Sequence, residues 1–141
     1  MQRTRKMGID YGDRRIGVAM TDALCIFSSP YEVFENHSQE QSLEHLNKLI
    51  KEFNVDEVAM GLPLNMDGSE GERAKIHREF GEKLASLSGV KVEYVDERLT
   101  SAEAEEILIQ SKVRREKRKE LIDKISAQII LQTYLNQIKR G

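Results

Sequence analysis

The chain has 141 residues, of which 39% are hydrophobic and 33% charged, with a formal net charge of −2 at pH 7. This composition is typical of a folded globular protein and excludes a disordered or fibrous one. Its length predicts a single domain over residues 1–141. No apolar run approaches the roughly 20 residues that span a bilayer, and no apolar signal core follows "MQRTRK", so we expect a cytoplasmic protein with no membrane contact.

Three strands and one helix are predicted in the first part of the chain. Residues 6–12, 14–21 and 23–34 are rich in apolar or β-branched side chains between turn signals, which predicts an antiparallel meander. In the third strand, Cys25 is expected to pack as a small hydrophobic residue. Residues 42–54 have helical spacing of apolar residues, at Leu43, Leu46, Leu49, Ile50 and Phe53.

The second part of the chain alternates strands and helices. Residues 55–63 and 90–97 are predicted strands. Ser69 with Glu72 forms a capping-box pattern that predicts the start of a helix ending at Gly89, with its buried residues at Ile76, Phe80, Leu84 and Leu87. Thr100 with Glu103 predicts a short polar helix in the same way, reaching about residue 110.

The last helix is predicted over about 119–138. Apolar residues cover most sides of its middle, which favours a helix sandwiched in the core, namely Ile122, Ile125, Ile129, Ile130, Leu131, Tyr134 and Leu135. A meander followed by helix, strand, helix, strand and helices predicts an α/β fold with a mixed sheet. The three histidines, His37, His45 and His77, are scattered and are expected on the surface or on helix faces.

Acidic residues follow two of the predicted strands. Asp10 closes the first strand, and Asp96 with Glu97 closes the last. Ligands bind beyond the carboxyl ends of parallel strands in such sheets. Asp123 lies on one helical line with Ala127, Ile130 and Tyr134, a poor place for a lone charge.

Three converging carboxylates become favourable once a divalent cation neutralises them, and all-oxygen ligands suit Mg²⁺ or Mn²⁺. Such a site performs in-line displacement at phosphorus with two ions about 4 Å apart. Each acid also has an ordinary interpretation. Asp10 is also typical of a turn residue. Asp96 and Glu97 are also typical of solvated residues that lead into the Thr100 cap. Asp123 could form an ion pair with a neighbouring lysine or arginine.

Two further segments fit a phosphodiester substrate. The loop "NMDGSEG" precedes a predicted helix and either binds a phosphate through backbone N–H groups or is a plain connector; it lacks the lysine of a P-loop. The run "KVRREKRK" is either a solvated helix edge or a surface for a nucleic-acid backbone. The predicted nucleic-acid-binding residues are Arg14, Arg15, Arg98, Lys112, Arg114, Arg115 and Arg118.

Four blocks resemble the YqgF (RuvX) family: "GIDYGDRRIGVAMTD", "GLPLNMDGSEGERA", "YVDERLTSAEAEEIL" and "IDKISAQIILQTYL". They occur in order over nearly the whole chain. The resemblance implies an RNase H-like fold with a five-stranded mixed sheet, an antiparallel three-strand meander plus two parallel strands, flanked by helices. It also implies Asp10, Glu97 and Asp123 as catalytic, metal-binding acids. Ser126 departs mildly from the family, which often has alanine there.

The resemblance implies a Mg²⁺- or Mn²⁺-dependent endonuclease that matures the 5′ end of pre-16S rRNA in ribosome biogenesis or resolves Holliday junctions. Its partners would be pre-rRNA or branched DNA, ribosomal particles, and a second copy in a homodimer. One alternative is a non-catalytic ribosome-assembly factor that binds RNA. Another is an actin- or hexokinase-like ATPase, whose phosphate-binding hairpin is similar to residues 10–22; such enzymes need two lobes, and 141 residues supply one.

Overall fold

Five strands form one mixed sheet in the order β3-β2-β1-β4-β5 in the computed structural model, which describes residues 4–98, 106, 109–110 and 114–140. The antiparallel meander and the parallel pairs β1–β4 and β4–β5 are those predicted. The bounds are β1 (Arg5–Tyr11), β2 (Arg15–Thr21), β3 (Ser28–Glu35), β4 (Val55–Leu62) and β5 (Lys91–Asp96). The five-stranded sheet is therefore confirmed, with its central strand carrying Asp10.

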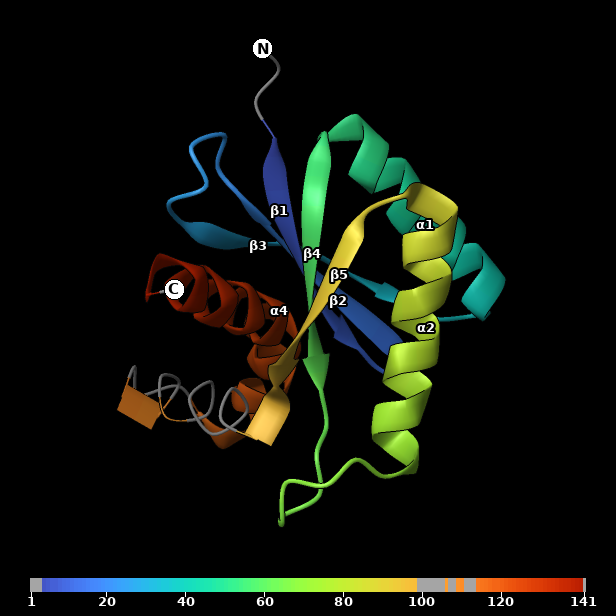
Figure 1. Ribbon diagram of the computed structural model, residues 1–141. Helices are drawn as coiled ribbons and strands as arrows, with labels where there is room; N and C mark the ends of the chain where they lie inside the picture. The colour runs from blue at the N-terminus through green and yellow to red at the C-terminus, as the bar shows by residue number, and fades with distance from the viewer. Residues whose placement is uncertain (1–3, 99–105, 107–108, 111–113, 141) are drawn as a thin grey trace.

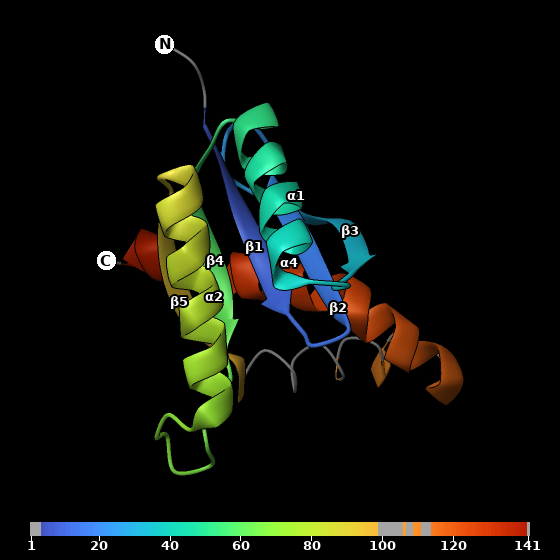
Figure 2. The ribbon, with the colours of Figure 1, turned by 90° about the vertical axis from the view of Figure 1, so that its right-hand side faces the viewer.

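The helices cover both faces of this sheet. Helices α1 (Gln39–Glu52) and α2 (Glu72–Ser88) lie on one face, and α4 (Arg115–Arg140) crosses the other (Figure 1, Figure 2). Because β1, β4 and β5 run the same way, their carboxyl ends lie at one edge, the lower edge in Figure 1. We call this the carboxyl edge. Candidate ligands of a site there come from several strands at once.

The side chains of β1 alternate between two cores, as a strand buried on both faces requires. Met7, Ile9 and Tyr11 pack with residues of α1 and α2, including Phe80. Gly8 faces α4 instead, because a Cβ built there would lie 2.5 Å from the carbonyl oxygen of Ala127. Asp10 is two residues further along β1, so its side chain belongs to the α4 face.

Replacing Gly8 with alanine is expected to destabilise the protein by about 2–3 kcal/mol, the range for overpacking a filled core. The new Cβ would meet the backbone of Ala127 at 2.5 Å and the Cβ of Leu131 at 2.7 Å, and neither atom is the far end of a flexible side chain. Urea denaturation followed by circular dichroism measures the change. An unchanged midpoint would contradict this close packing of α4 on β1.

The connection between β2 and β3 differs from the prediction. β3 begins at Ser28 rather than at residue 23, because the Asp22 carboxylate accepts hydrogen bonds from the backbone of Leu24, Ile26 and Phe27 and forms a loop. Cys25 lies in this loop with φ +56°. Its Sγ donates to the Thr4 carbonyl at 3.3 Å, so its prediction as a packed strand residue was wrong.

Helix α2 also starts differently. Its N-cap is Gly71, with no side-chain cap, because the Ser69 hydroxyl donates to Asp67 within the preceding loop. The capping box of Ser69 and Glu72 was therefore wrong. Phe80 and Leu84 are fully buried as predicted, whereas Ile76 and Leu87 are exposed.

Helix α4 is longer than the predicted 119–138 and packs on one face of the sheet. Its buried residues are Ala127, Ile129, Ile130, Leu131, Tyr134 and Leu135. The predicted cap at Thr100 and Glu103 lies outside the described residues. Among the described helices, none combines the length and apolarity of a membrane span.

Candidate active site

Two carboxylates from distant parts of the chain meet at the carboxyl edge. Asp10 lies near the end of β1, and Glu97 is the first residue after β5. The protonated Glu97 carboxyl donates a side-chain hydrogen bond to Asp10. The structure thus brings together two of the three acids that the sequence analysis selected.

Gly61 on β4, which lies between β1 and β5, makes room for this pair. A Cβ at position 61 would lie 2.6 Å from Oε1 of Glu97 and 2.8 Å from Cδ1 of Ile130. Any larger residue would push the Glu97 carboxyl away from the sheet. The glycine therefore allows a carboxylate to lie flat on the central strands, between the sheet and α4.

The environment of Glu97 strongly favours its neutral form. Burial is the largest cause, followed by the hydrogen bond to Asp10 and the negative charge of Asp10, and together they raise the pKa of Glu97 from 4.5 to about 8. Two buried acids that are hydrogen-bonded to each other cannot both be ionised without a counter-charge. Near neutral pH the pair therefore shares a proton, and a cation that binds there must displace it.

Asp96 takes a different role from Glu97. Its carboxylate is held by Arg98, whose Nη2 lies 2.7 Å from Oδ2, and this bond lowers the pKa of Asp96. Sequence reasoning alone left both acids open for the site. The structure places Glu97 beside Asp10, while Asp96 is occupied by Arg98.

Asp123 lies on α4 one turn before Ala127, whose carbonyl meets Gly8 of β1. Its side chain lies outside the described part of the structure, so its convergence with Asp10 and Glu97 stays a prediction. Among the described side chains, no group of three acids, histidines or cysteines forms a metal-binding cluster.

Arg73 is a residue near this site that the sequence analysis did not select. It is the second residue of α2, and its Nη1 lies 3.6 Å from Oδ2 of Asp13 in the β1–β2 turn. Its positive charge acts on Glu97 and lowers the pKa of that carboxyl, against the larger effect of burial. An arginine in "GSEGERA" carries no periodic signal, so only the fold reveals that it reaches the carboxylates.

His77 links α2 to the floor of the site. Its Nδ1 donates to the Gly61 carbonyl at 3.0 Å, and its ring packs edge-on against Tyr11 with 5.2 Å between centroids. Burial lowers its pKa, so the ring is neutral near pH 7. The side chain is 2% exposed and lies on the buried face of α2, so of the two expected places, the surface and a helix face, it takes the second.

The predicted nucleic-acid-binding residues lie in three places: the β1–β2 turn, the end of β5 and the start of α4. Arg14 and Arg15 are exposed at the β1–β2 turn, where they line a hollow with Asp13, Glu35, Asn36 and His37. Arg98 donates to Asp96 and to backbone carbonyls of the β4–α2 loop. None of these contacts involves a nucleic acid, so the binding roles of the three arginines stay predictions.

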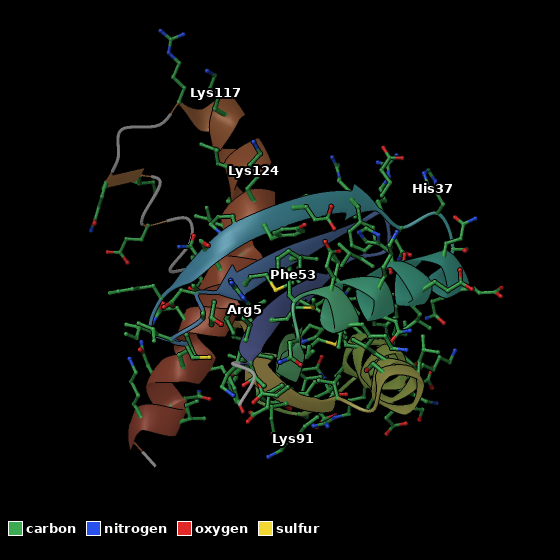
Figure 3. All side chains as sticks on the ribbon, turned by 90° about the horizontal axis from the view of Figure 1, so that it is seen from above. Arg5, His37, Phe53, Lys91, Lys117 and Lys124 are labelled. Carbon is green, nitrogen blue, oxygen red and sulfur yellow. The ribbon has the colours of Figure 1, made fainter. Side chains whose placement is uncertain are left out.

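The basic run leads into α4. Arg114 is exposed, Lys112 lies outside the described residues, and the side chains of Arg115 and Arg118 also lie outside them. Figure 3 shows Lys117 and Lys124 on the first half of α4, with Lys117 pointing away from the protein. Exposed cations thus lie on the same helix as Asp123.

The strand order β3-β2-β1-β4-β5 and the helix α4 that crosses one face of the sheet are those of an RNase H-like fold. Among solved structures, T. thermophilus RuvC in complex with a Holliday junction substrate aligns with a TM-score of 0.62 at 14% identity, over 95% of this chain and 96% of that chain. The fowlpox virus Holliday junction resolvase aligns with a TM-score of 0.57 at 16% identity, over 95% and 99%. These likenesses show the shared fold.

The family described as "RuvX: Holliday junction resolvase" matches residues 4–137, and the chain belongs to this family. Curated relatives carry the name "Putative pre-16S rRNA nuclease". One from Halothermothrix orenii is 48% identical over 132 residues, 94% of each chain. Another, from Lactococcus lactis subsp. lactis, is 45% identical over 134 residues, also 94% of each. The resemblance inferred from the sequence is confirmed.

Proposed function

We propose that the protein is a Mg²⁺- or Mn²⁺-dependent endonuclease that cleaves structured nucleic acid, with residues 1–141 acting as one nuclease domain. Asp10, Glu97 and Asp123 hold the cation in this proposal. The observation that carries it is the buried Asp10–Glu97 pair, in which burial, the hydrogen bond between the two acids and the charge of Asp10 keep Glu97 protonated. A protein gains nothing in stability from such a pair, which is typical of a functional site.

The donor set fits a hard divalent cation. The pair offers only carboxylate oxygens, it lies partly shielded between β4 and α4, and its excess negative charge is what a dication would neutralise. In the two-ion form of this proposal, the carboxylates would hold cations whose chemistry is an acidified attacking water and charge stabilisation of the leaving oxygen. The residues of the chain bind and orient: Asp10 from a rigid central strand, and Glu97 against Gly61.

Basic residues hold the substrate in this proposal. Arg73, whose charge acts on Glu97 and whose Nη1 lies 3.6 Å from Oδ2 of Asp13, would contact the phosphate that reacts. Phosphates further along the backbone would be contacted by two other groups of basic residues and by Arg98. These groups are Arg14 and Arg15 at the β1–β2 turn, and the run that includes Lys112, Arg114, Arg115 and Arg118.

The relatives' name and the family's description favour two substrates, the 5′ end of pre-16S rRNA and a Holliday junction. We favour the rRNA precursor, because the curated relatives at 48% and 45% identity share that name. The proposal therefore includes a role in ribosome biogenesis in the cytoplasm, with ribosomal particles as partners and a homodimer as the working form.

Cleavage assays with both substrates test this function. The purified protein is incubated with a pre-16S rRNA fragment or a four-way DNA junction, in Mn²⁺ or in EDTA. The proposal expects endonucleolytic products in Mn²⁺ and none in EDTA. Salt-sensitive RNA binding without cleavage in either condition would contradict it and would favour the non-catalytic assembly factor.

Replacing Arg73 with alanine is expected to lower kcat/KM about 10- to 100-fold, because charge-assisted contacts to phosphate contribute a few kcal/mol. Lys75→Ala is a matched control, since Lys75 lies two residues further on the same helix and is exposed. Steady-state kinetics in Mn²⁺ compares the two variants. Equal, small effects of both would contradict a role for Arg73 at the site.

A further inference from the structure

One apolar side chain at the carboxyl edge is almost completely exposed. Met66, in the loop between β4 and α2, is 98% exposed, whereas Phe27 and Leu24, on the β2–β3 loop, are 71% and 60% exposed. Figure 1 shows the β4–α2 loop projecting beyond the carboxyl edge, while the β2–β3 loop lies at the opposite edge. Met66 is therefore presented to solvent on the same side as the Asp10–Glu97 pair.

This loop is well defined by its own hydrogen bonds. The backbone N–H of Asn65 donates to Ser69 at 2.9 Å, and that of Gly68 donates back to Asn65 at 2.9 Å. The N–H and hydroxyl of Ser69 both donate to the Asp67 carboxylate. Because these N–H groups are already bonded, the loop is poorly suited to the phosphate cradle considered from the sequence. It is a compact turn with Met66 at its tip.

Arg98 ties the turn to the active site. Its Nη1 donates to the carbonyl of Met66 at 3.3 Å, and its Nη2 and Nε bind Asp96 at the end of β5. Glu97 lies between Asp96 and Arg98 in the chain. The exposed methionine is thus fixed relative to the carboxyl pair through a single guanidinium group.

The charges around Met66 do not oppose an approaching nucleic acid as strongly as the sequence "NMDGSE" suggests. Hydrogen bonds from Ser69 lower the pKa of the Asp67 carboxyl, and the charge of Arg98 lowers it further. Glu70 is held by both Nε and Nη2 of Arg78, at 2.6 and 2.8 Å. The two acids of the loop are therefore partly neutralised by neighbouring arginines.

We propose that Met66 is a substrate-contacting residue that packs against an unpaired or unstacked base beside the phosphate that reacts at the Asp10–Glu97 pair. This inference rests on the proposed nuclease function and adds a preference for nucleic acid with an irregular step at the cleavage point. Flexible apolar side chains, methionine included, insert between bases that are partly unstacked. A regular duplex offers such a side chain only its polar backbone and grooves.

A protein partner fits the loop less well. Its polar neighbours Asn65, Asp67 and Ser69 leave Met66 as a single apolar group, and protein interfaces are built on larger apolar centres. A single apolar side chain matches the size of one base instead.

Two RNA duplexes of the same sequence test the proposal, one fully paired and one with an unpaired base at the cleavage point. The proteins are the wild type, Met66→Ser, Met66→Leu and the control Leu24→Ser at the opposite edge. We expect Met66→Ser to lower kcat/KM on the bulged RNA about tenfold, the effect of losing part of a methionine's burial. Met66→Leu and Leu24→Ser should remain within about twofold of the wild type, and the paired RNA should be cut equally slowly by all.

A second readout does not depend on cleavage. The unpaired base is flanked by 2-aminopurine, and binding is measured with Ca²⁺ in place of Mn²⁺. Wild-type protein should increase the fluorescence as the base unstacks, and Met66→Ser should bind without this increase. An unchanged increase and unchanged kinetics in Met66→Ser would overturn the inference and leave Met66 to a protein partner.

The two proposals fail in different ways. If the wild type cuts neither RNA in Mn²⁺, the proposed nuclease function fails, and the fluorescence comparison still decides whether Met66 contacts a base. If the wild type cuts both RNAs equally well, the preference for an irregular step is wrong while the nuclease function stands. A loss in Leu24→Ser equal to that in Met66→Ser would also overturn the inference.

Discussion

Replacing Asp10 with asparagine is expected to reduce Mn²⁺-dependent cleavage at least about a thousandfold, because it removes a ligand of a cation whose charge stabilisation is worth several kcal/mol. The substitution keeps the shape of the side chain and its place on the central strand. It also removes the one buried negative charge that the pair keeps near neutral pH, so the folded protein should be no less stable than the wild type. Initial rates on the preferred substrate and thermal unfolding in EDTA measure both effects.

Asp56→Asn is the matched control for this substitution. Asp56 lies near the start of β4, far from the carboxyl edge, where it pairs with Lys6 at 3.3 Å. Cleavage by Asp56→Asn should stay within about twofold of the wild type, since exposed ion pairs contribute little. Activity of Asp10→Asn comparable to that of this control would show that Asp10 is not part of the catalytic site.

Replacing Glu97 with glutamine is expected to change how stability depends on pH. The pKa of Glu97 is about 8 in the folded protein and near 4.5 when the side chain is solvated, so the folded state binds the extra proton between these values. In the wild type without metal, the contribution of Glu97 to the free energy of unfolding should therefore be fully present below about pH 4.5. It should be lost progressively as pH rises toward 8. The free energy of unfolding changes by at most about 1.4 kcal/mol per pH unit, and this change reflects the coupled titration of Asp10 and Glu97.

Glu97→Gln has no proton to lose, so this slope should disappear and the variant should be the more stable protein at pH 8. Urea denaturation in EDTA at several pH values between 5 and 8.5 measures the difference. The same variant should lose Mn²⁺-dependent cleavage. Because it is the more stable protein at pH 8, this loss of activity would not be due to unfolding. Parallel stability curves for the two proteins would show that Glu97 is not held neutral.

Much of the fold follows from local patterns. The strands and both crossover helices were found from apolar runs between turn signals, and the position of Asp10 at a strand end followed directly. The errors arose where a side chain had a competing partner. Ser69 bonds Asp67 rather than capping α2, and Asp22 closes a loop where a longer strand was expected.

The site was only partly predictable. Spacing placed acids at two strand ends, but it did not separate Asp96 from Glu97, because the choice depends on Arg98 binding one and Gly61 admitting the other. The places of Arg73 and His77 at the site were not predicted, for a related reason. They reach the site from α2 across a tertiary contact, and one sequence contains no signal for such a contact.

A crystal structure of the protein soaked in Mn²⁺ tests the central claim most directly, because anomalous scattering locates the ion without reference to activity. The account predicts a Mn²⁺ ion bound at the carboxyl edge by oxygens of Asp10 and Glu97, with Asp123 of α4 completing the set. An ion bound elsewhere, or an Asp10–Glu97 pair that stays hydrogen-bonded and without metal in saturating Mn²⁺, would contradict it.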